Sequence, residues 1–305
     1  MSQARAWLID SHAQIWRAWH VYDKERTDRA GRPVNALLGF ADYLLALIES
    51  TWQPSQPAPI ITAVFDAPCG RGHRQAIYPE YKGHRPPTPP RLQEQFPRCR
   101  ELAMAAGFGA LDYAGFEADD VIGTLVGRLR SRERAVTIVT GDKDLAQLLG
   151  PDDRWYNPMR GAVMAYGDVE RRFGVRPTQI ADWLALAGDA SDNIPGVPGI
   201  GPRTAARLLR KHDSIDGIYE NLSAVYGMKF RGAPRVQRQL QENEEQVRLS
   251  RQLTEIVCDL PLAQTPTPWQ GIDRAALVGL LEQAGADPAQ IERWEAWDEP
   301  LVRSA

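Results

Sequence analysis

The sequence predicts an α/β fold with a central, mainly parallel sheet flanked by helices. Three short apolar runs, Ala6–Ile9, Ile60–Phe65 and Ala135–Val139, have the length and β-branched content of buried strands. Between them lie segments in which apolar residues recur every three or four positions, the period of a helix that packs on one face. Strands that alternate with helices in this way favour a parallel sheet.

The remaining elements follow in chain order. Apolar residues at helical spacing predict one helix between Leu37 and Ile48 and another over Asp119–Leu129. Residues 86–90, Pro-Pro-Thr-Pro-Pro, cannot lie inside a helix or a central strand, so we expect an exposed connection there. From about residue 168 the pattern becomes helical, and after about residue 262 the chain is richer in Pro, Gln and Trp.

Composition excludes several classes of protein. The chain has 305 residues, of which 43% are hydrophobic and 25% charged, as in an ordinary globular protein with a sizeable core. No run approaches the length of a membrane span, and Asp10 interrupts the first apolar run, so we expect neither a membrane segment nor a signal peptide. The three cysteines form no CxxC pair, which suits a reducing cytosol and argues against a disulfide framework or a zinc site.

Positive charge is concentrated locally although the net charge is −3. The stretch from Arg71 to Arg100 contains seven Lys or Arg residues and two acids. A protein that binds nucleic acid needs a basic face rather than a basic total. A solvated surface stretch is the simpler explanation of such a run taken alone.

Acidic residues follow the ends of the predicted strands. Asp10, Asp66 and Asp142 each lie at a strand end or just beyond it. Because parallel strands end at the same edge of a sheet, we expect these three side chains to converge, although any one of them alone would suit a turn. Further carboxylates lie close by in sequence or in short groups of their own: Glu117, Asp119 and Asp120; Asp144; and Asp189 with Asp192.

Each of these groups also has a structural explanation. Acids in the first turn of a helix interact favourably with its dipole. Asp189 and Asp192 would share a face if that segment were helical, but Asp192-Asn193 before Ile194-Pro195 equally suits a cap or turn.

Together, up to nine carboxylates aimed at one place would raise one another's pKa values unless cations compensate their charge. Oxygen ligands without His or Cys favour Mg²⁺ or Mn²⁺ over Zn²⁺. Two such ions about 4 Å apart would support an in-line phosphoryl displacement, in which one ion activates the attacking water.

A glycine-rich turn, residues 196–201, lies between two predicted helices. Its glycines permit close approach of the backbone and leave N–H groups at the head of the next helix, which is an anion site. Pro202 is well tolerated in the first turn of that helix. A tight turn without a ligand is the alternative, but four cations follow within the helix: Arg203, Arg207, Arg210 and Lys211. They favour contact with DNA phosphates, which would not depend on base sequence.

In their order along the chain these motifs resemble the flap endonuclease and 5′–3′ exonuclease family, which includes the 5′-nuclease domain of bacterial DNA polymerase I and the phage flap endonucleases. The resemblance covers roughly residues 5–260. The matching stretches are Leu8-Ile9-Asp10, Val64-Phe65-Asp66, Tyr81-Lys82 with Arg85, Glu117-Ala118-Asp119-Asp120, Thr140-Gly141-Asp142-Lys143-Asp144, residues 188–196 and the glycine-rich turn.

The resemblance implies roles for individual residues. The first metal cluster would be held by Asp10, Asp66, Glu117, Asp119 and Asp142. The second would be held by Asp144, Asp189 and Asp192, with Asp119 and Asp142 near both clusters. Asp120 also matches an acid of this motif. Lys82 and Arg85 resemble cations that contact the scissile phosphate, so the implied catalytic residues are Lys82, Arg85, Asp142 and Asp119.

Further implied contacts involve DNA. Tyr81 is expected to stack on the terminal base, and Arg17, Arg71 and Arg74 match basic positions near the substrate. The glycine-rich turn resembles a helix–hairpin–helix, which in this family can hold K⁺. Its implied DNA contacts are Gly196, Gly199, Gly201, Arg203 and Thr204.

The same resemblance implies an organisation and a setting. Residues 1–172 would form a PIN-like nuclease core with a helical arch at about 78–105. Residues 173–262 would form the helix–hairpin–helix region, and residues 263–305 a tail of unknown role. The expected protein is a cytoplasmic monomer, without membrane contact, that requires two Mg²⁺ ions, with Mn²⁺ as a substitute. It would cut DNA at 5′ flaps, nicks or free 5′ ends in replication and repair, in association with a DNA polymerase.

Two other functions compete with DNA cleavage. PIN-type ribonucleases share acids on a similar sheet, but they usually lack the glycine-rich turn and are much shorter. A DNA-binding protein without catalysis would keep the basic stretches and yield no product. Cleavage of matched DNA and RNA flaps distinguishes the first alternative, and salt-sensitive binding without a product distinguishes the second.

Overall fold

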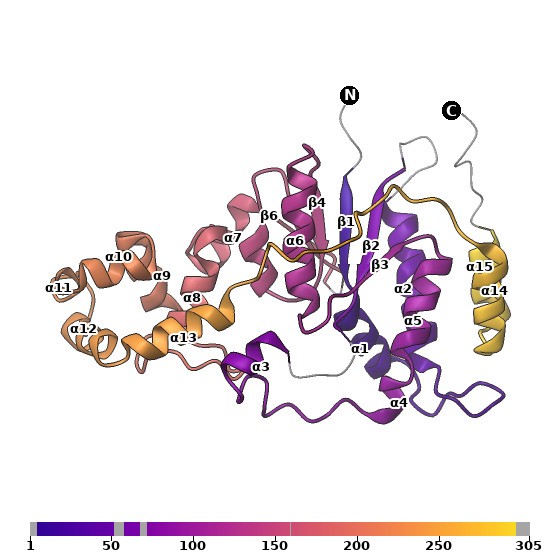
Figure 1. The fold of residues 1–305 in the computed structure, drawn as a ribbon, viewed down its shortest axis with the longest axis horizontal. Helices are drawn as coiled ribbons and strands as arrows, with labels where there is room; N and C mark the ends of the chain where they lie inside the picture. The colour runs from indigo at the N-terminus through magenta and orange to yellow at the C-terminus, as the bar shows by residue number, and fades with distance from the viewer. Residues whose placement is uncertain (1–4, 52–57, 68–71, 159, 297–305) are drawn as a thin grey trace. The chain divides into compact units, whose positions relative to one another are not determined.

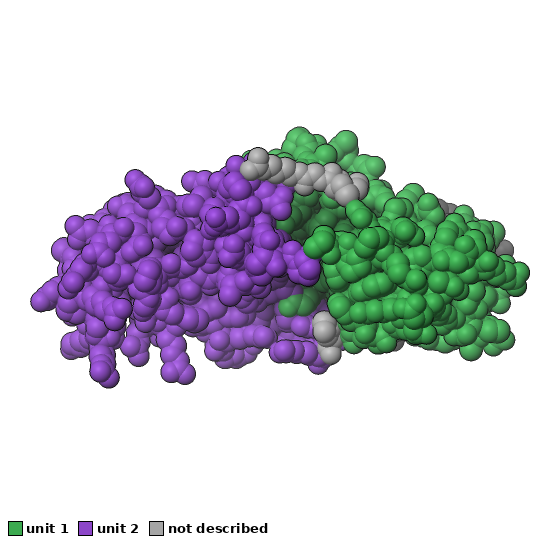
Figure 2. All heavy atoms as spheres, turned by 90° about the horizontal axis from the view of Figure 1, so that it is seen from below, with its two compact units in different colours: residues 1–68, 87–141, 258–305 green, residues 69–86, 142–257 purple. Residues whose placement is uncertain are grey.

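The computed structural model describes residues 5–51, 58–67, 72–158 and 160–296. These form two compact units, each assembled from separate stretches of the chain (Figure 2). The first unit comprises residues 1–68, 87–141 and 258–305, and the second comprises residues 69–86 and 142–257.

A parallel sheet forms the centre of the first unit. Its strands, in spatial order, are β3 (Gly109–Leu111), β2 (Ile60–Val64), β1 (Ala6–Asp10) and β4 (Val136–Val139). In register, Leu8 of β1 pairs with Thr62 of β2 on one side and with Ile138 of β4 on the other. The predicted parallel sheet and its three strands are confirmed. The short strand β3 was not predicted.

Helices surround this sheet (Figure 1). They are α1 (Ser11–Val21), α2 (Asn35–Thr51), α4 (Pro90–Gln93), α5 (Phe96–Ala105), α6 (Ala118–Arg130), α14 (Arg274–Gln283) and α15 (Pro288–Glu295). α6 packs against β1, β2 and β4, while α2 packs between α1 and α5. The two helices predicted from apolar spacing are therefore α2 and α6. Residues 86–89 are not helical and Pro86 and Pro87 are exposed, which confirms the connection predicted from the prolines.

The chain returns to the first unit after residue 257. We call residues 258–273 the C-terminal strap. Arg128 of α6 donates hydrogen bonds to the strap carbonyls of Leu260 and Leu262. Further along, the Trp269 N–H donates to the carbonyl of Pro59, and its indole Nε1 donates to the carbonyl of Ala106 at 2.8 Å. These contacts hold the strap to α6, to the start of β2 and to the end of α5.

Two further helices follow the strap. α14 packs against α5 and against α15. Trp294 of α15 is buried, and Gln290 donates from Nε2 to the carbonyl of Leu38 in α2. The segment expected to be a tail thus contains two helices that pack on the sheet-bearing unit.

The second unit is mainly helical. Its antiparallel hairpin consists of β5 (Arg154–Asn157) and β6 (Ala162–Ala165). Its helices are α3 (His73–Ile77), η1 (Asp144–Leu148), α7 (Tyr166–Phe173), η2 (Pro177–Gln179), α8 (Ile180–Ala187), α9 (Pro202–His212), α10 (Ile215–Glu220), α11 (Leu222–Val225), α12 (Ala233–Glu242) and α13 (Glu244–Thr254). α8 packs against both α9 and α13, so it forms the centre of this unit. Within the described residues, no helix is long and apolar enough to cross a membrane.

Candidate active site

The first unit fixes Asp10 at the carboxyl end of β1. Asp10 is 7% exposed and caps α1, because its Oδ1 accepts a hydrogen bond from the Ala13 N–H at 3.3 Å. Its other oxygen, Oδ2, accepts from the buried Thr140 hydroxyl at 2.8 Å. These two donors hold the Asp10 carboxyl in one orientation at the edge of the sheet.

Asp66 follows the neighbouring strand β2, two residues after Val64, which pairs with Asp10. Its Oδ1 accepts a hydrogen bond at 2.8 Å from the N–H of Ala118, the first residue of α6. Its backbone N–H donates to Nδ1 of His12 at 3.1 Å. Burial lowers the pKa of His12 even though Asp66 raises it, and a neutral imidazole is required to accept this bond. Asp66 is thus positioned at the positive end of the α6 dipole.

The acids that open α6 differ in their surroundings. Asp120 is fully buried and its Oδ2 accepts from the Glu117 N–H at 3.3 Å, which closes the first turn of the helix. Glu117 and Asp119 are partly exposed. The hydrogen bond from Ala118 to Asp66 brings this acidic turn to the carboxyl end of β2. In the first unit the sheet edge therefore collects Asp66 and the α6 acids beside Asp10.

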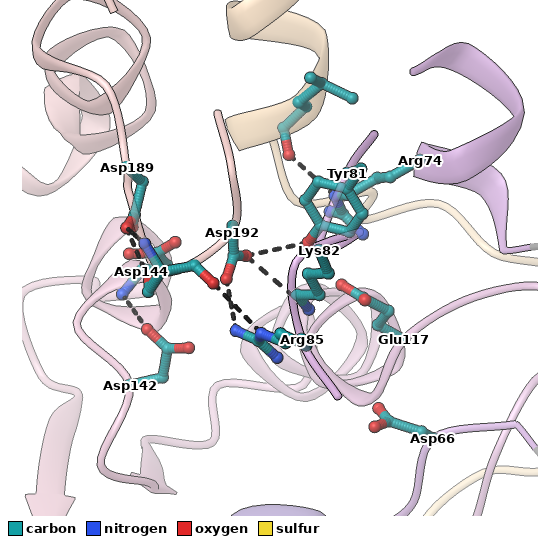
Figure 3. A network of polar contacts seen from close by, with 12 residues as sticks. Asp66, Arg74, Tyr81, Lys82, Arg85, Glu117, Asp142, Asp144, Asp189 and Asp192 are labelled. Carbon is teal, nitrogen blue, oxygen red and sulfur yellow. Dashed lines mark hydrogen bonds and ion pairs between the residues drawn. The ribbon is translucent and has the colours of Figure 1, made fainter. Parts of the chain in front are cut away.

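The second unit contains a separate acidic group that includes Asp142, Asp144 and Asp189 (Figure 3). Lys143 Nζ lies 2.5 Å from Asp189 Oδ2 and 3.2 Å from Asp144 Oδ1. Asp142 is exposed, and its Oδ1 accepts a hydrogen bond from the Asp144 N–H at 2.9 Å. Ser191 donates to Asp189 Oδ1 from its N–H and its hydroxyl, at 2.8 and 2.6 Å. One lysine thus bridges two of the predicted metal ligands.

These surroundings shift the pKa values of Asp144 and Asp189 in opposite directions. Burial, followed by the charge of Asp142, raises the pKa of Asp144 to about 7, although Lys143 opposes the shift. Burial also disfavours the charged form of Asp189, but hydrogen bonds from Lys143 and Ser191 outweigh it and lower that pKa. The crowding of carboxylates around Asp144 is the kind that a divalent cation relieves.

Asp192 forms ion pairs with the two cations that are predicted to bind phosphate. Arg85 Nη2 lies 2.6 Å from Asp192 Oδ1, and Lys82 Nζ lies 3.7 Å from Oδ2 (Figure 3). The Tyr81 hydroxyl donates to the same Oδ2 at 3.0 Å, and the Lys82 N–H donates to the Asp192 carbonyl. The 81–85 segment and Asp192, separated by more than a hundred residues, are therefore joined through side chains and backbone.

Asp189 and Asp192 lie in a turn and not on a helix face. The Asp189 N–H donates to the Ile194 carbonyl at 2.9 Å, and the Ile194 N–H donates to the Asp189 carbonyl at 2.8 Å, which closes a tight loop. Within it Asn193 has φ 57, and Lys82, which contacts the loop, has φ 54. Strained backbone of this kind costs free energy and persists only where its surroundings hold it. Of the two arrangements considered from the sequence, the helical one is wrong and the turn is observed.

The donor chemistry of these groups fits a hard divalent cation. The atoms predicted to bind it are carboxylate oxygens, with the half-buried Asp144 among them. In the structure, part of the negative charge of these carboxylates is neutralised by Lys143, Lys82 and Arg85. No three His, Cys, Asp or Glu side chains within the described ranges already form a cluster able to hold a metal.

Other predicted DNA contacts lie in different environments. Arg74 is 5% exposed, and its guanidinium donates to the carbonyls of Leu253 and Glu255, both at 2.8 Å. Tyr81 is 3% exposed. Interior positions of this kind give no support to a phosphate contact by Arg74 or to stacking by Tyr81. Arg17 is partly exposed on α1, and Arg71 lies outside the described residues.

The glycine-rich turn connects α8 to α9 as predicted. Gly196 approaches the backbone so closely that a Cβ would lie 2.4 Å from the Gly188 nitrogen, and Gly199 has φ +83. Val197 and Ile200 are buried beneath the turn. Gly199 and Gly201 are exposed, and within the described chain neither donates its N–H to another residue. Two exposed glycine amides therefore lie at the start of an eleven-residue helix, and the anion site there stays a prediction.

Four residues of these groups were not assigned a role from the sequence: His12, Thr140, Lys143 and Ser191. All lie within two residues of a predicted acid. Their types are common near turns and strand ends, so proximity in sequence was the available signal. Proximity in sequence does not reveal which of these four side chains directs a polar atom towards a carboxylate.

Most of the chain matches models of known protein families. Residues 5–174 match the family described as 5′-3′ exonuclease, N-terminal resolvase-like domain. Residues 175–279 match 5′-3′ exonuclease, C-terminal SAM fold. The 5′-3′ exonuclease of Aquifex aeolicus is 35% identical over 257 residues, which cover 84% of this chain and 83% of that protein.

DNA polymerase I from Pseudomonas aeruginosa is 39% identical over 263 residues, covering 86% of this chain. The match spans only 28% of that polymerase. Among solved structures, bacteriophage T5 5′-exonuclease with bound divalent metal ions (zinc) superposes with a TM-score of 0.64 at 18% identity, covering 95% of this chain and 97% of the other. The catalytic core of Rad2 in complex with DNA substrate gives a TM-score of 0.62 at 14% identity, covering 99% of this chain and 93% of the other. These two likenesses establish a shared fold.

Proposed function

The chain belongs to the 5′–3′ exonuclease family, and on this premise we propose that it is a structure-specific 5′-nuclease. It hydrolyses DNA phosphodiesters at 5′ flaps, nicks or free 5′ ends and leaves 5′-phosphate products. One observation carries the proposal: Asp192, a predicted metal ligand, is bound by Lys82 and Arg85, the two predicted phosphate-binding cations. Acids and cations that together suit a metal-assisted phosphoryl displacement therefore meet on one turn.

Divalent cations, Mg²⁺ first and Mn²⁺ as a substitute, belong to this proposal. The residues proposed to hold them are Asp10, Asp66, Glu117, Asp119 and Asp142 for one ion, and Asp144, Asp189 and Asp192 for the other. When bound, such ions neutralise charge on the scissile phosphate and lower the pKa of the attacking water. The exclusively oxygen donor set, together with the raised pKa of Asp144, supports this assignment.

The cations of the 81–85 segment have their own part in the mechanism. Lys82 and Arg85 both direct their charge at Asp192. A phosphate oxygen competes with a carboxylate for the same donors, since both are anions that accept charge-assisted hydrogen bonds. The two side chains therefore bind the scissile phosphate and stabilise the negative charge that develops on it.

The glycine-rich turn binds the duplex rather than the reacting bond. The outward N–H groups of Gly199 and Gly201 contact phosphate, with Arg203 and Thr204 at the head of α9. Contacts of this kind position the substrate without reading its sequence. The carbonyls of the same turn are the proposed site for K⁺. In the cell, the protein acts as a monomer beside a DNA polymerase.

A comparison of three substrates tests the proposal. The purified chain is incubated with a 5′-labelled DNA flap, the same flap in RNA, and nicked duplex, in Mg²⁺ and in EDTA. We expect cleavage of the DNA flap near its junction in Mg²⁺, none in EDTA, and slower cleavage of RNA. Preference for the RNA flap would contradict the DNA assignment. Salt-sensitive binding without product in either Mg²⁺ or Mn²⁺ would contradict catalysis.

A further inference from the structure

A second basic region lies in the helical unit, away from the glycine-rich turn in sequence. Between Glu220 and Glu242 the chain carries four cations and no acidic residue: Lys229, Arg231, Arg235 and Arg238. We call these four side chains the α12 cations. All four are exposed. α12 packs inward through Ala233, Val236 and Leu240, so Arg235 and Arg238 lie on its outer face. Lys229 and Arg231 lie just before the helix.

The α12 cations are not engaged with carboxylates. Within the described part of the chain none of them forms an ion pair or side-chain hydrogen bond. Other exposed arginines of the same unit do: Arg171 pairs with Asp168, Arg176 with Asp213, and Arg248 with Asp216. Paired cations contribute little to the surface potential, whereas unpaired ones add to it.

This surface is continuous with the cationic face of α9. The guanidinium of Arg207 lies over the ring of Phe230 with 6.0 Å between Cζ and the ring centroid. Phe230 lies between Lys229 and Arg231, so the contact joins the two groups of cations. On α9, Arg203, Arg207 and Lys211 follow at intervals of four and share one helix face. An exposed aromatic ring, Tyr226 at 63% exposure, lies at the start of the same stretch.

We propose that the α12 cations form a second contact with the phosphate backbone of the duplex arm, beyond the contact made by the glycine-rich turn. This inference rests on the proposed function, which supplies the duplex. A row of unpaired, exposed cations without intervening acids fits a polyanion with regularly spaced charges, and binding there releases counterions. The contact lengthens the duplex that the protein engages without adding sequence preference.

Salt dependence of binding provides the test. Each phosphate neutralised adds about 0.9 to the slope of log K against log salt on B-DNA. The variant Lys229→Ala/Arg235→Ala/Arg238→Ala should therefore lose about 2 to 3 from the slope for a flap substrate with a two-turn duplex arm. The same variant should lose little affinity for a flap whose arm is shorter than one helical turn. Circular dichroism of the variant checks that it is folded.

The matched control is Arg171→Ala/Arg176→Ala/Arg248→Ala. It removes the same formal charge from exposed residues of the same unit, but from cations that have carboxylate partners. We expect its slope to stay close to that of the wild type. An α12 variant with an unchanged slope, or with equal losses on short and long arms, overturns the proposal. So does a loss of affinity for single-stranded DNA that equals the loss for duplex. Because the readout is binding, a wild-type protein that binds but never cuts contradicts the proposed nuclease alone.

Discussion

Thr140 and Thr137 form a natural pair for testing how the acidic corner of the first unit is held. Both are buried, but Thr140 donates to Asp10, whereas the Thr137 hydroxyl has no hydrogen-bond partner among the described residues. Thr140→Val removes a donor from a buried carboxylate and should cost about 1–2 kcal/mol of unfolding free energy. Thr137→Val removes an unsatisfied hydroxyl and should be neutral or stabilising. Urea unfolding without metal measures both, and equal effects would contradict the role of Thr140.

Lys82 provides the residue-level prediction for catalysis. Lys82→Ala removes a cation proposed to contact the scissile phosphate, so the single-turnover cleavage rate should fall by about 10²–10³-fold. Affinity for the duplex should change little, because the duplex contacts lie on the glycine-rich turn. His84→Ala, an exposed neighbour without an assigned role, is the control. An unchanged rate in Lys82→Ala removes Lys82 from the mechanism.

At the scale of residues, the acids could be proposed from the sequence, whereas the side chains that surround them could not. Acids beyond strand ends were recognisable because a parallel sheet directs them to one edge. Arg74 was expected at the DNA, but its position depends on carbonyls at the end of α13, about 180 residues further along. Tyr81 likewise depends on Asp192. Such partners come from tertiary packing, which short motifs do not encode.

The α8–α9 turn provides a prediction at the level of elements. Gly199 has φ +83 and is open to solvent, so Gly199→Ala imposes a backbone cost of about 1–2 kcal/mol and disturbs the outward amides. We expect roughly tenfold weaker binding to nicked duplex, which corresponds to about 1.4 kcal/mol. Gly285→Ala is the control, because Gly285 also has positive φ and open space but lies between α14 and α15. Equal, wild-type affinities in the two variants would contradict the phosphate contact.

Which elements could be predicted depended on how regular their patterns are. β1, β2 and β4 are continuous apolar runs, and α2 and α6 have apolar residues at helical spacing, so all five were found. β3 is only three residues long and contains Gly109 and Ala110, which carry little strand preference. α14 and α15 were missed because the Pro-, Gln- and Trp-rich region showed no motif, although buried Trp269 and Trp294 anchor it.

At the scale of the whole molecule, the C-terminal strap provides a prediction about stability. A Cβ on Gly107 would lie 1.9 Å from the Gly271 carbonyl oxygen of the strap. Gly107→Ala should therefore push the strap away from the end of α5 and cost about 3 kcal/mol of unfolding free energy, from the clash and from positive φ. Gly115→Ala has similar φ and open space, so it should cost only about 1 kcal/mol. Urea denaturation of the pair measures the difference, and equal losses would show that the strap contributes little.

The organisation of the chain into units was beyond sequence reasoning for a physical reason. The first unit is built from three separate stretches and the second from two. Residues 69–86 belong with the helical unit although they lie between segments of the sheet-bearing one. Composition and periodicity describe neighbours along the chain, and they do not show when a segment leaves one unit and returns to it.

Single-turnover cleavage of a 5′-labelled DNA flap in Mg²⁺ by the wild type and by Asp142→Ala tests the central claim most directly. Glu282→Ala, an exposed acid on α14, is the matched control. We predict cleavage near the junction by the wild type and the control, and loss of cleavage in Asp142→Ala with flap binding retained. Equal cleavage by Asp142→Ala would contradict the proposed metal site. Binding without cleavage by the wild type itself would contradict the nuclease assignment.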